Sequence, residues 1–165
     1  MQKDTAKEFE VRIKENESLL YKVCRVYTVM KADREDLFQE IVIQLWKAYP
    51  NFKGASKFST WLYRVAINTA ITGLRKKKNI EVSYEPSKLP LHIVDENLNR
   101  EAEEKLKQLY DAVDELNDVD KAIVILYMED RPYEEMEEIL GISQGNLRVK
   151  MNRIKEKLRQ LTKTN

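Results

Sequence analysis

The chain has 165 residues and little of what builds several common kinds of site. It contains one cysteine, Cys24, and one histidine, His92, so no disulfide forms within the chain and no cysteine–histidine cluster exists to hold a metal ion. Only four glycines and four prolines are present, whereas charged residues make up 35% of the chain. This composition favours helices over a β-protein rich in turns.

Long hydrophobic runs are also missing. The longest, residues 122–128, is far shorter than the roughly 20 apolar residues of a membrane-spanning helix. Residues 1–10 are mostly polar and do not look like a secretory signal. Together with the single cysteine, these features predict a cytoplasmic protein that does not insert directly into a membrane.

The net charge of +1 conceals a strong sorting of charges along the chain. Residues 51–80 contain seven lysines and arginines and no acid, and residues 148–163 contain seven basic residues and one acid. Between these two basic zones, residues 95–120 contain ten acidic and three basic residues. Two separated basic zones indicate two contacts with a polyanion, although solvated helix faces without any partner produce similar runs.

The residue patterns that most enzymes need are absent. The sequence has no histidine cluster, no glycine-rich loop suited to cradle phosphate, and no carboxylates grouped near the basic zones. These absences argue against a nuclease or a ligase. We therefore predict that the chain is not an enzyme and has no catalytic residue, no metal ligand and no cofactor.

Apolar residues recur at helical spacing along most of the chain. In the first thirty residues they predict one or two helices. The next helix is expected to start with Asp33 as its cap and to end at Pro50. A further helix is expected to start with Ser59 as its cap and to lead into the basic run 75–78.

Residues 79–100 contain two of the four prolines and show no sustained helical period, which predicts a flexible interdomain linker. His92 lies in this linker and is expected to be solvated rather than to act as a ligand. More helical patterns follow. The sequence therefore predicts an all-α protein made of two small helical domains, residues 1–78 and 101–165.

The C-terminal pattern is that of a helix-turn-helix. Residues 132–158, PYEEMEEILGISQGNLRVKMNRIKEKL, comprise a short helix, a tight turn at Gly141, and Ser143 as the cap of a long last helix. Apolar side chains in the last helix recur every three or four residues and are expected to pack inward. These inward residues are Leu147, Met151, Ile154 and Leu158.

The opposite face of the last helix is then expected to enter the major groove of DNA, where amide and guanidinium groups distinguish base edges. Its candidate DNA-binding residues are Gln144, Asn146, Arg148, Val149, Lys150 and Arg153. Lys155 lies further along and is expected to meet phosphate. A basic helix that only packs on its own domain is the alternative. Glu137 stands where this motif usually has a small residue, which predicts a changed crossing angle between the two helices.

Three segments carry a resemblance to a known family. Residues 33–54 read DREDLFQEIVIQLWKAYPNFKG, residues 56–78 read SKFSTWLYRVAINTAITGLRKKK, and residues 116–143 read LNDVDKAIVILYMEDRPYEEMEEILGIS. In this order they resemble the core-polymerase-binding helix, the promoter-melting helix and the C-terminal domain of the extracytoplasmic-function (ECF) sigma factors. These proteins are initiation subunits of bacterial RNA polymerase.

The resemblance covers nearly the whole chain and implies both a function and a set of partners. The chain would direct core RNA polymerase to specific promoters and promote the melting of promoter DNA. Its first domain would correspond to sigma region 2, which binds the clamp helices of the largest polymerase subunit and the minus-10 element. Its second domain would correspond to sigma region 4, which binds the polymerase flap and the minus-35 element. An anti-sigma factor is a further implied partner.

Residue by residue, the resemblance implies two sites in the first domain. The implied polymerase-binding residues are Asp36, Gln39, Glu40, Gln44 and Trp46. The implied minus-10 residues, around a pocket that holds a flipped base in the family, are Ala48, Phe52, Lys57, Val65, Asn68 and Arg75. Phe52 would form a wall of the pocket, and Asn68 would bond the base.

Several residues leave room for another interpretation. Phe52, Phe58, Trp61 and Tyr63 are suited to stack on bases but also to fill the core of a small domain, and Trp61 is the expected core residue. Thr72 and Gly73 depart from the Asp and the basic residue that are common at this point in the family. A glycine there is expected to fray the end of the helix.

The main alternative function is a stand-alone transcriptional regulator with an N-terminal dimerisation or ligand-binding domain. This alternative explains the helix-turn-helix but only half of the chain. Such a regulator would bind duplex DNA without polymerase. A sigma factor alone is expected to bind DNA weakly and with strong salt dependence.

Overall fold

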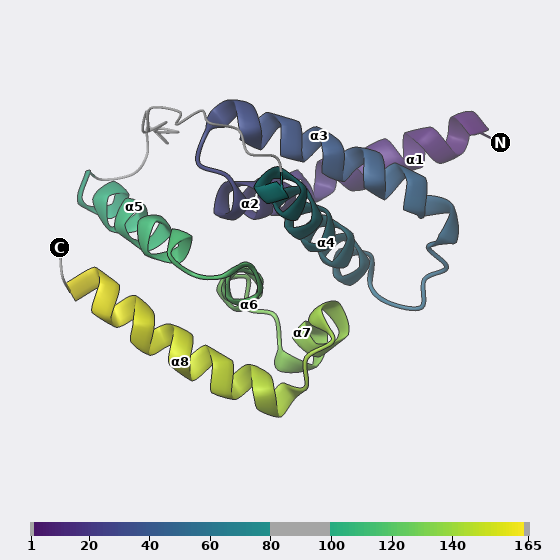
Figure 1. Ribbon diagram of the computed structural model, residues 1–165. Helices are drawn as coiled ribbons and strands as arrows, with labels where there is room; N and C mark the ends of the chain where they lie inside the picture. Colours follow the sequence, from purple (N-terminus) through teal and green to yellow (C-terminus); the bar gives the residue numbers. More distant parts are fainter. Residues whose placement is uncertain (1, 80–99, 164–165) are drawn as a thin grey trace. The chain divides into compact units, whose positions relative to one another are not determined.

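The computed structural model describes residues 2–79 and 100–163, and within these ranges all regular structure is helical (Figure 1). The chain divides into two compact units, residues 1–88 and 89–165. The predicted all-α fold with two small helical units is therefore confirmed. The limits of the predicted linker 79–100 stay a prediction, because the linker prolines and His92 lie outside the described residues.

Among residues 2–79, the N-terminal unit contains four α-helices and one short 3₁₀ helix. In chain order these are α1 (Gln2–Glu15), α2 (Glu17–Tyr27), α3 (Lys31–Ala48), η1 (Tyr49–Asn51) and α4 (Phe58–Asn79). Helices α2, α3 and α4 pack against one another in all three pairings, and α1 packs on α2. The first thirty residues thus form two helices, separated at Asn16.

The predicted helix starts are wrong at two places. Helix α3 begins at Lys31, so Asp33 lies within its first turn rather than capping it. The reason is that the backbone N–H of Arg34 donates to the carbonyl of Met30 at 3.0 Å, which starts the helical bonding earlier. Helix α4 begins at Phe58, so Ser59 is also helical.

The predicted end of α4 needs correction as well. The helix continues through Gly73 to Asn79 instead of fraying at the glycine. One glycine costs a helix about 1 kcal/mol, which the packing of α4 on α2 and α3 outweighs. Side chains beyond Gly73 in this helix, including that of Arg75, lie outside the described part of the structure.

The core of the N-terminal unit is built from apolar side chains of α2, α3 and α4. Fully buried members include Leu20, Val23, Cys24, Ile41, Leu45, Leu62, Tyr63 and Ala66. Tyr63 is therefore the core aromatic of α4, whereas Trp61, which the sequence favoured for this role, is only half-buried. Burial raises the pKa of the Cys24 thiol to about 12, so this thiol stays protonated at neutral pH.

The described part of the C-terminal unit, residues 100–163, consists of four helices: α5 (Arg100–Asp114), α6 (Asp118–Met128), α7 (Tyr133–Leu140) and α8 (Gln144–Lys163). Helix α8 packs on α5, α6 and α7. The predicted inward residues Leu147, Met151 and Ile154 are buried, and Leu158 is half-buried. The helical period of the last helix thus placed its inner face correctly.

The turn between α7 and α8 has the geometry that the sequence predicted. Gly141 ends α7 with a left-handed backbone (φ of 70°), and its N–H donates to the Glu137 carbonyl at 2.8 Å. The Ser143 hydroxyl accepts a hydrogen bond from the N–H of Asn146 at 3.3 Å, so Ser143 caps α8 as expected. Pro132 stands at the cap position of α7.

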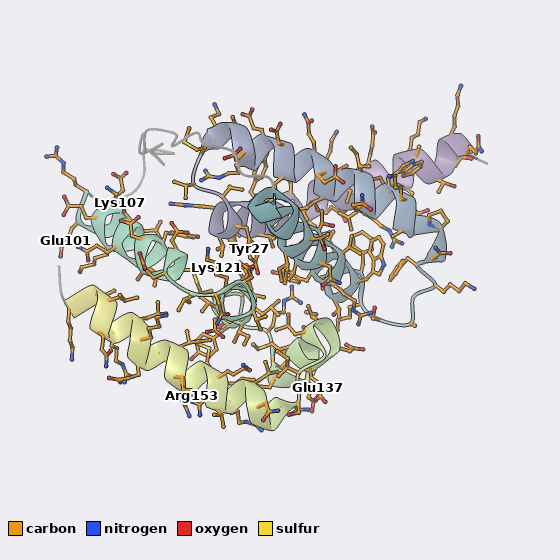
Figure 2. All side chains as sticks on the ribbon, in the orientation of Figure 1. Tyr27, Glu101, Lys107, Lys121, Glu137 and Arg153 are labelled. Atoms are coloured by element: carbon orange, nitrogen blue, oxygen red, sulfur yellow. The ribbon has the colours of Figure 1, made fainter. Side chains whose placement is uncertain are left out.

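Glu137 lies on the exposed side of α7 (Figure 2). Its carboxylate therefore remains in solvent instead of entering the approach between α7 and α8. The changed crossing angle that this residue predicts is not tested by the burial of its side chain and stays a prediction.

Two glycines in this unit provide a matched test of the turn. We expect Gly141→Ala to lower the free energy of unfolding by about 1 kcal/mol, because a Cβ is strained in the left-handed region. Gly145→Ala is expected to raise it by about 0.5 kcal/mol, because Gly145 is helical and a Cβ there meets nothing within 4 Å. Urea unfolding of both variants measures the difference. Equal changes in the two variants would contradict the assigned turn.

Candidate functional site

Helix α8 presents one face to solvent that carries no acid along its first three turns. Asn146, Arg148, Val149 and Arg153 are exposed, and Gln144 and Lys150 are half-buried. The inward side chains fix this orientation, since residues three and four apart share a helix face. Figure 2 shows Arg153 on α8, and no described residue makes an ion pair or hydrogen bond with its guanidinium. The face is chemically suited to reading base edges.

Some basic residues of α8 have partners within their own unit. The Arg148 guanidinium lies 5.1 Å from the centroid of the Tyr133 ring, and the Lys155 ammonium lies 4.6 Å from that of Tyr127. Such cation–π contacts contribute about 0.5–1 kcal/mol at exposed sites. The half-buried Lys155 is therefore held against α6, and a contact with phosphate would compete with its ring partner.

In the N-terminal unit, the predicted polymerase-binding residues lie along α3. Asp36, Gln39, Glu40 and Trp46 are exposed, and Gln44 is half-buried. The Gln44 side-chain amide donates to the Glu40 carboxylate at 2.9 Å. The Trp46 ring is 44% exposed and packs edge-on against Phe9 of α1, with ring centroids 5.1 Å apart. Trp46 is thus neither a core residue nor fully exposed to solvent.

Four aromatic rings form a cluster at the start of α4 and the loop before it. This aromatic cluster consists of Tyr49, Phe52, Phe58 and Trp61. Trp61 lies at its centre, with ring centroids at 5.1 Å from Phe52, 5.4 Å from Phe58 and 6.3 Å from Tyr49. All four rings are half-buried and so keep accessible surface. Accessible rings next to basic side chains are what single-stranded nucleic acid needs for stacking.

Helix α1 contributes a residue to this cluster that the sequence reasoning missed. The Arg12 guanidinium lies 5.1 Å from the Phe58 ring and 6.0 Å from the Tyr49 ring, and it pairs with Glu8 at 2.9 Å. Burial and a hydrogen bond with Glu8 raise the pKa of Tyr49. The spacing of Glu8 and Arg12 was visible in the sequence as a helical ion pair, but their aromatic partners were not.

The remaining minus-10 candidates with described side chains lie on α3, on α4 and in the loop between them. Ala48 is the last residue of α3, Lys57 is exposed just before α4, and Val65 and Asn68 follow one another on α4 at a spacing of one turn. Asn68 is exposed, and Phe52 is not among the residues that line the pocket beside it. Asn68 lines a pocket of about 390 Å³ together with Glu40, Gln44, Thr69, Thr72 and Gly73. The structure thus brings one minus-10 candidate beside two polymerase-binding candidates.

The family models for Sigma-70 region 2 and for Sigma-70, region 4 match residues 12–80 and 106–158. The chain is 30% identical over 139 residues to the ECF RNA polymerase sigma-E factor of Haemophilus influenzae, covering 78% of this chain and 74% of the relative. The chain belongs to the ECF sigma factors. RNA polymerase sigma factor SigV of Bacillus subtilis is 29% identical over 147 residues, covering 87% of this chain and 84% of SigV.

Two solved structures have the same fold. The sigma factor RpoE of Bartonella quintana, in complex with the anti-sigma factor NepR, superposes with a TM-score of 0.78 at 19% identity, covering 96% of this chain and 99% of RpoE. CnrH, in complex with the cytosolic domain of CnrY, gives a TM-score of 0.70 at 17% identity, covering 97% and 90% of the two chains. At these identities the likeness concerns the fold.

Membership of the family decides the function. As an ECF sigma factor, the chain directs RNA polymerase to specific promoters and takes part in transcription initiation. It is therefore an initiation factor rather than a stand-alone regulator. No helix among the described residues is both long and apolar enough to cross a membrane. Within residues 2–79 and 100–163, no three or more His, Cys, Asp or Glu side chains are grouped to hold a metal ion.

Proposed function

We propose that the two units divide the recognition of the promoter between them, without any catalytic step. The N-terminal unit, residues 1–78, binds the polymerase clamp helices and the minus-10 element. The C-terminal unit, residues 101–165, binds the polymerase flap and reads the minus-35 element through α8, and residues 79–100 link the two. The observation that carries this proposal is the outer face of α8, which has no acid along its first three turns and on which the Arg153 guanidinium has no partner among the described residues.

The energetics of melting support a unit that captures bases rather than one that unwinds the duplex. Opening ten base-pair steps costs about 14 kcal/mol in stacking, at about 1.4 kcal/mol per step. Each base stacked on an aromatic ring returns roughly 1–3 kcal/mol. Two captured bases therefore supply less than half of the cost, so the polymerase provides most of it and the aromatic cluster traps the opened strand.

An anti-sigma factor belongs to the proposal as a further partner. The two solved structures of the same fold were both determined with a partner, an anti-sigma factor in the case of RpoE and the cytosolic domain of CnrY in the case of CnrH. The family resemblance implies the same kind of partner for this chain. Because RNA polymerase is a cytoplasmic enzyme in bacteria, we place the function of this chain in the cytoplasm.

Arg153→Ala is the direct test of minus-35 reading. A good contact between a guanidinium and a guanine edge is worth about 1–3 kcal/mol, so initiation at minus-35-dependent promoters is expected to fall about fivefold to a hundredfold. Run-off transcription with core polymerase and templates varied in the minus-35 element measures the effect. Unchanged preference among these templates would remove Arg153 from the reading surface.

Arg159→Ala is the matched control on the same helix. Arg159 is exposed and pairs with Glu156 at 3.6 Å, two turns beyond the reading end of α8. Losing its charge is expected to weaken DNA binding evenly across sequences and to leave the preference among minus-35 variants unchanged. If both variants change the preference among minus-35 templates equally, the loss of positive charge, and not the loss of a base contact, explains the effect of Arg153→Ala.

A further inference from the structure

The loop between η1 and α4, residues 52–57, carries Phe52 but has few interactions of its own to hold it in place. Residues 53–56 make no hydrogen bond or ion pair with any described residue. Gly54 has a left-handed backbone (φ of 73°), which turns the chain within the loop. The placement of this loop therefore depends on the residues at its two ends.

One side chain of α1 meets both ends of the loop. The Arg12 guanidinium lies 6.0 Å from the centroid of the Tyr49 ring, which precedes the loop, and 5.1 Å from that of the Phe58 ring, which follows it. These separations are those of cation–π contacts. Arg12 thus connects two rings that stand on opposite sides of the loop.

Other residues of α1 hold this guanidinium against the rings. The Glu8 carboxylate, one turn earlier on α1, pairs with Arg12 at 2.9 Å and accepts a hydrogen bond from Tyr49. The buried Phe9 ring lies 5.2 Å from the Tyr49 ring, measured between centroids. The Arg12 side chain is 35% exposed, so most of its surface is covered by these neighbours. This face of α1 is therefore fixed against η1 and the start of α4.

The contact reaches the Phe52 ring through Phe58. The Phe58 ring lies edge-on to the Phe52 ring, with centroids 5.6 Å apart. Holding Phe58 in place therefore also holds the neighbour on which Phe52 packs. A ring that is already oriented loses less conformational entropy when a base stacks on it than a ring that must first be ordered.

We infer that Arg12 is a positioning residue for promoter opening: its guanidinium holds both ends of the loop 52–57 and thereby presents the Phe52 ring to the unpaired strand. The inference rests on the proposed trapping of the opened strand by the aromatic cluster. It gives α1 a role in opening that needs no contact between α1 and DNA. A cation that binds phosphate acts through its charge, whereas this role depends on a planar guanidinium that stacks on rings.

Arg12→Gln is the first test, with holoenzyme assembled from the full chain and core polymerase. The rate of promoter opening at saturating holoenzyme, followed by permanganate reactivity of unpaired thymines, is expected to fall about fivefold. This loss corresponds to about 1 kcal/mol, the strength of one or two exposed cation–π contacts. The holoenzyme concentration that half-saturates the promoter is expected to change less than twofold. An unchanged rate of opening overturns the inference.

Lys14→Gln is the matched control on the same helix. Lys14 is exposed and has no ring contact with any described residue, so the substitution removes the same charge without disturbing the loop. Its rate of opening is expected to equal that of the parent chain. Far-ultraviolet circular dichroism of both variants checks that their helix content is unchanged. An equal loss of opening in both variants would assign the effect to the net charge of α1 and overturn the inference.

Arg12→Lys separates stacking from charge. Lysine keeps the positive charge, but its ammonium is a compact point charge that does not stack on two rings as a guanidinium does. This variant is therefore expected to open promoters as slowly as Arg12→Gln, to within about twofold. Full recovery of opening by lysine would show that the charge alone suffices, as for a direct phosphate contact, and would overturn the positioning role.

A double-mutant cycle with Phe52→Leu separates this inference from the proposed function. If Arg12 acts through the Phe52 ring, adding Arg12→Gln to Phe52→Leu is expected to slow opening by less than about twofold further. A full fivefold further loss would show that Arg12 acts independently of that ring, so the inference fails while strand trapping stands. Parent-like opening by Phe52→Leu alone would contradict strand trapping itself, and the inference would fall with it.

Discussion

Replacing Leu147 with alanine is expected to remove most of the stability of the C-terminal unit and with it minus-35-dependent initiation. Leu147 is completely buried on the inner face of α8, where the helix packs on α5, α6 and α7. Truncating a buried leucine costs about 2–5 kcal/mol. At about 0.05–0.15 kcal/mol per residue, a unit of this size has only roughly 3–10 kcal/mol of stability in total. The substitution therefore leaves little to hold α8 in place.

Val149→Ala is the control for this prediction. Val149 lies two residues further along the same helix but is 50% exposed, so its truncation is expected to change the free energy of unfolding by less than about 0.5 kcal/mol. Thermal unfolding followed by circular dichroism, together with run-off transcription, compares the two variants. An unfolding temperature of Leu147→Ala equal to that of the parent would contradict the assigned core of this unit.

Phe52→Ala is expected to reduce the formation of open promoter complexes about fivefold to a hundredfold. Its half-buried ring contacts Phe58 and Trp61, with centroids 5.6 Å and 5.1 Å away, and keeps surface accessible to an unstacked base. Losing a base–ring stack costs roughly 1–3 kcal/mol, and each 1.4 kcal/mol is a factor of ten. Permanganate reactivity of unpaired thymines on a promoter fragment measures the opened fraction.

Two milder substitutions at Phe52 separate stacking from packing. Phe52→Leu keeps apolar bulk against the neighbouring rings but has no ring face, so it is expected to open promoters as poorly as Phe52→Ala while the unit stays folded. Phe52→Tyr keeps the ring and is expected to behave like the parent chain. Wild-type opening by Phe52→Leu would show that the ring serves only to fill the aromatic cluster.

The sequence predicted the two helical units and the outward face of α8 because both depend on periodicity. In α8 the inward positions repeat every three or four residues, so the burial of Leu147, Met151 and Ile154 followed from spacing alone. The turn was equally local, because Gly141 supplies the left-handed backbone and Ser143 the cap. The start of α3 was not predicted, because it depends on a backbone hydrogen bond from Arg34 to Met30 rather than on the capping ability of Asp33.

Helical periodicity could not predict which side chains contact one another in the N-terminal unit. Trp61 and Tyr63 are two positions apart, and only the packing of α4 on α2 and α3 decides that Tyr63 fills the core while Trp61 stays half-buried. Arg12 reaches the rings of Tyr49 and Phe58 across more than thirty residues of sequence. Contacts of this kind depend on how helices are placed in space, which no local pattern encodes.

By itself, the sequence of this sigma factor determined the helical class, the two-unit organisation, the helix-turn-helix and the outward face of α8, because short-range spacing and charge sorting specify each of these. Only the tertiary structure decided which side chains share a site. It placed Glu40 and Gln44 of α3 beside Asn68 of α4, more than twenty residues away in the chain. The physical reason is that a helix face is set by neighbours three or four residues apart, whereas a pocket between helices is set by which faces pack together.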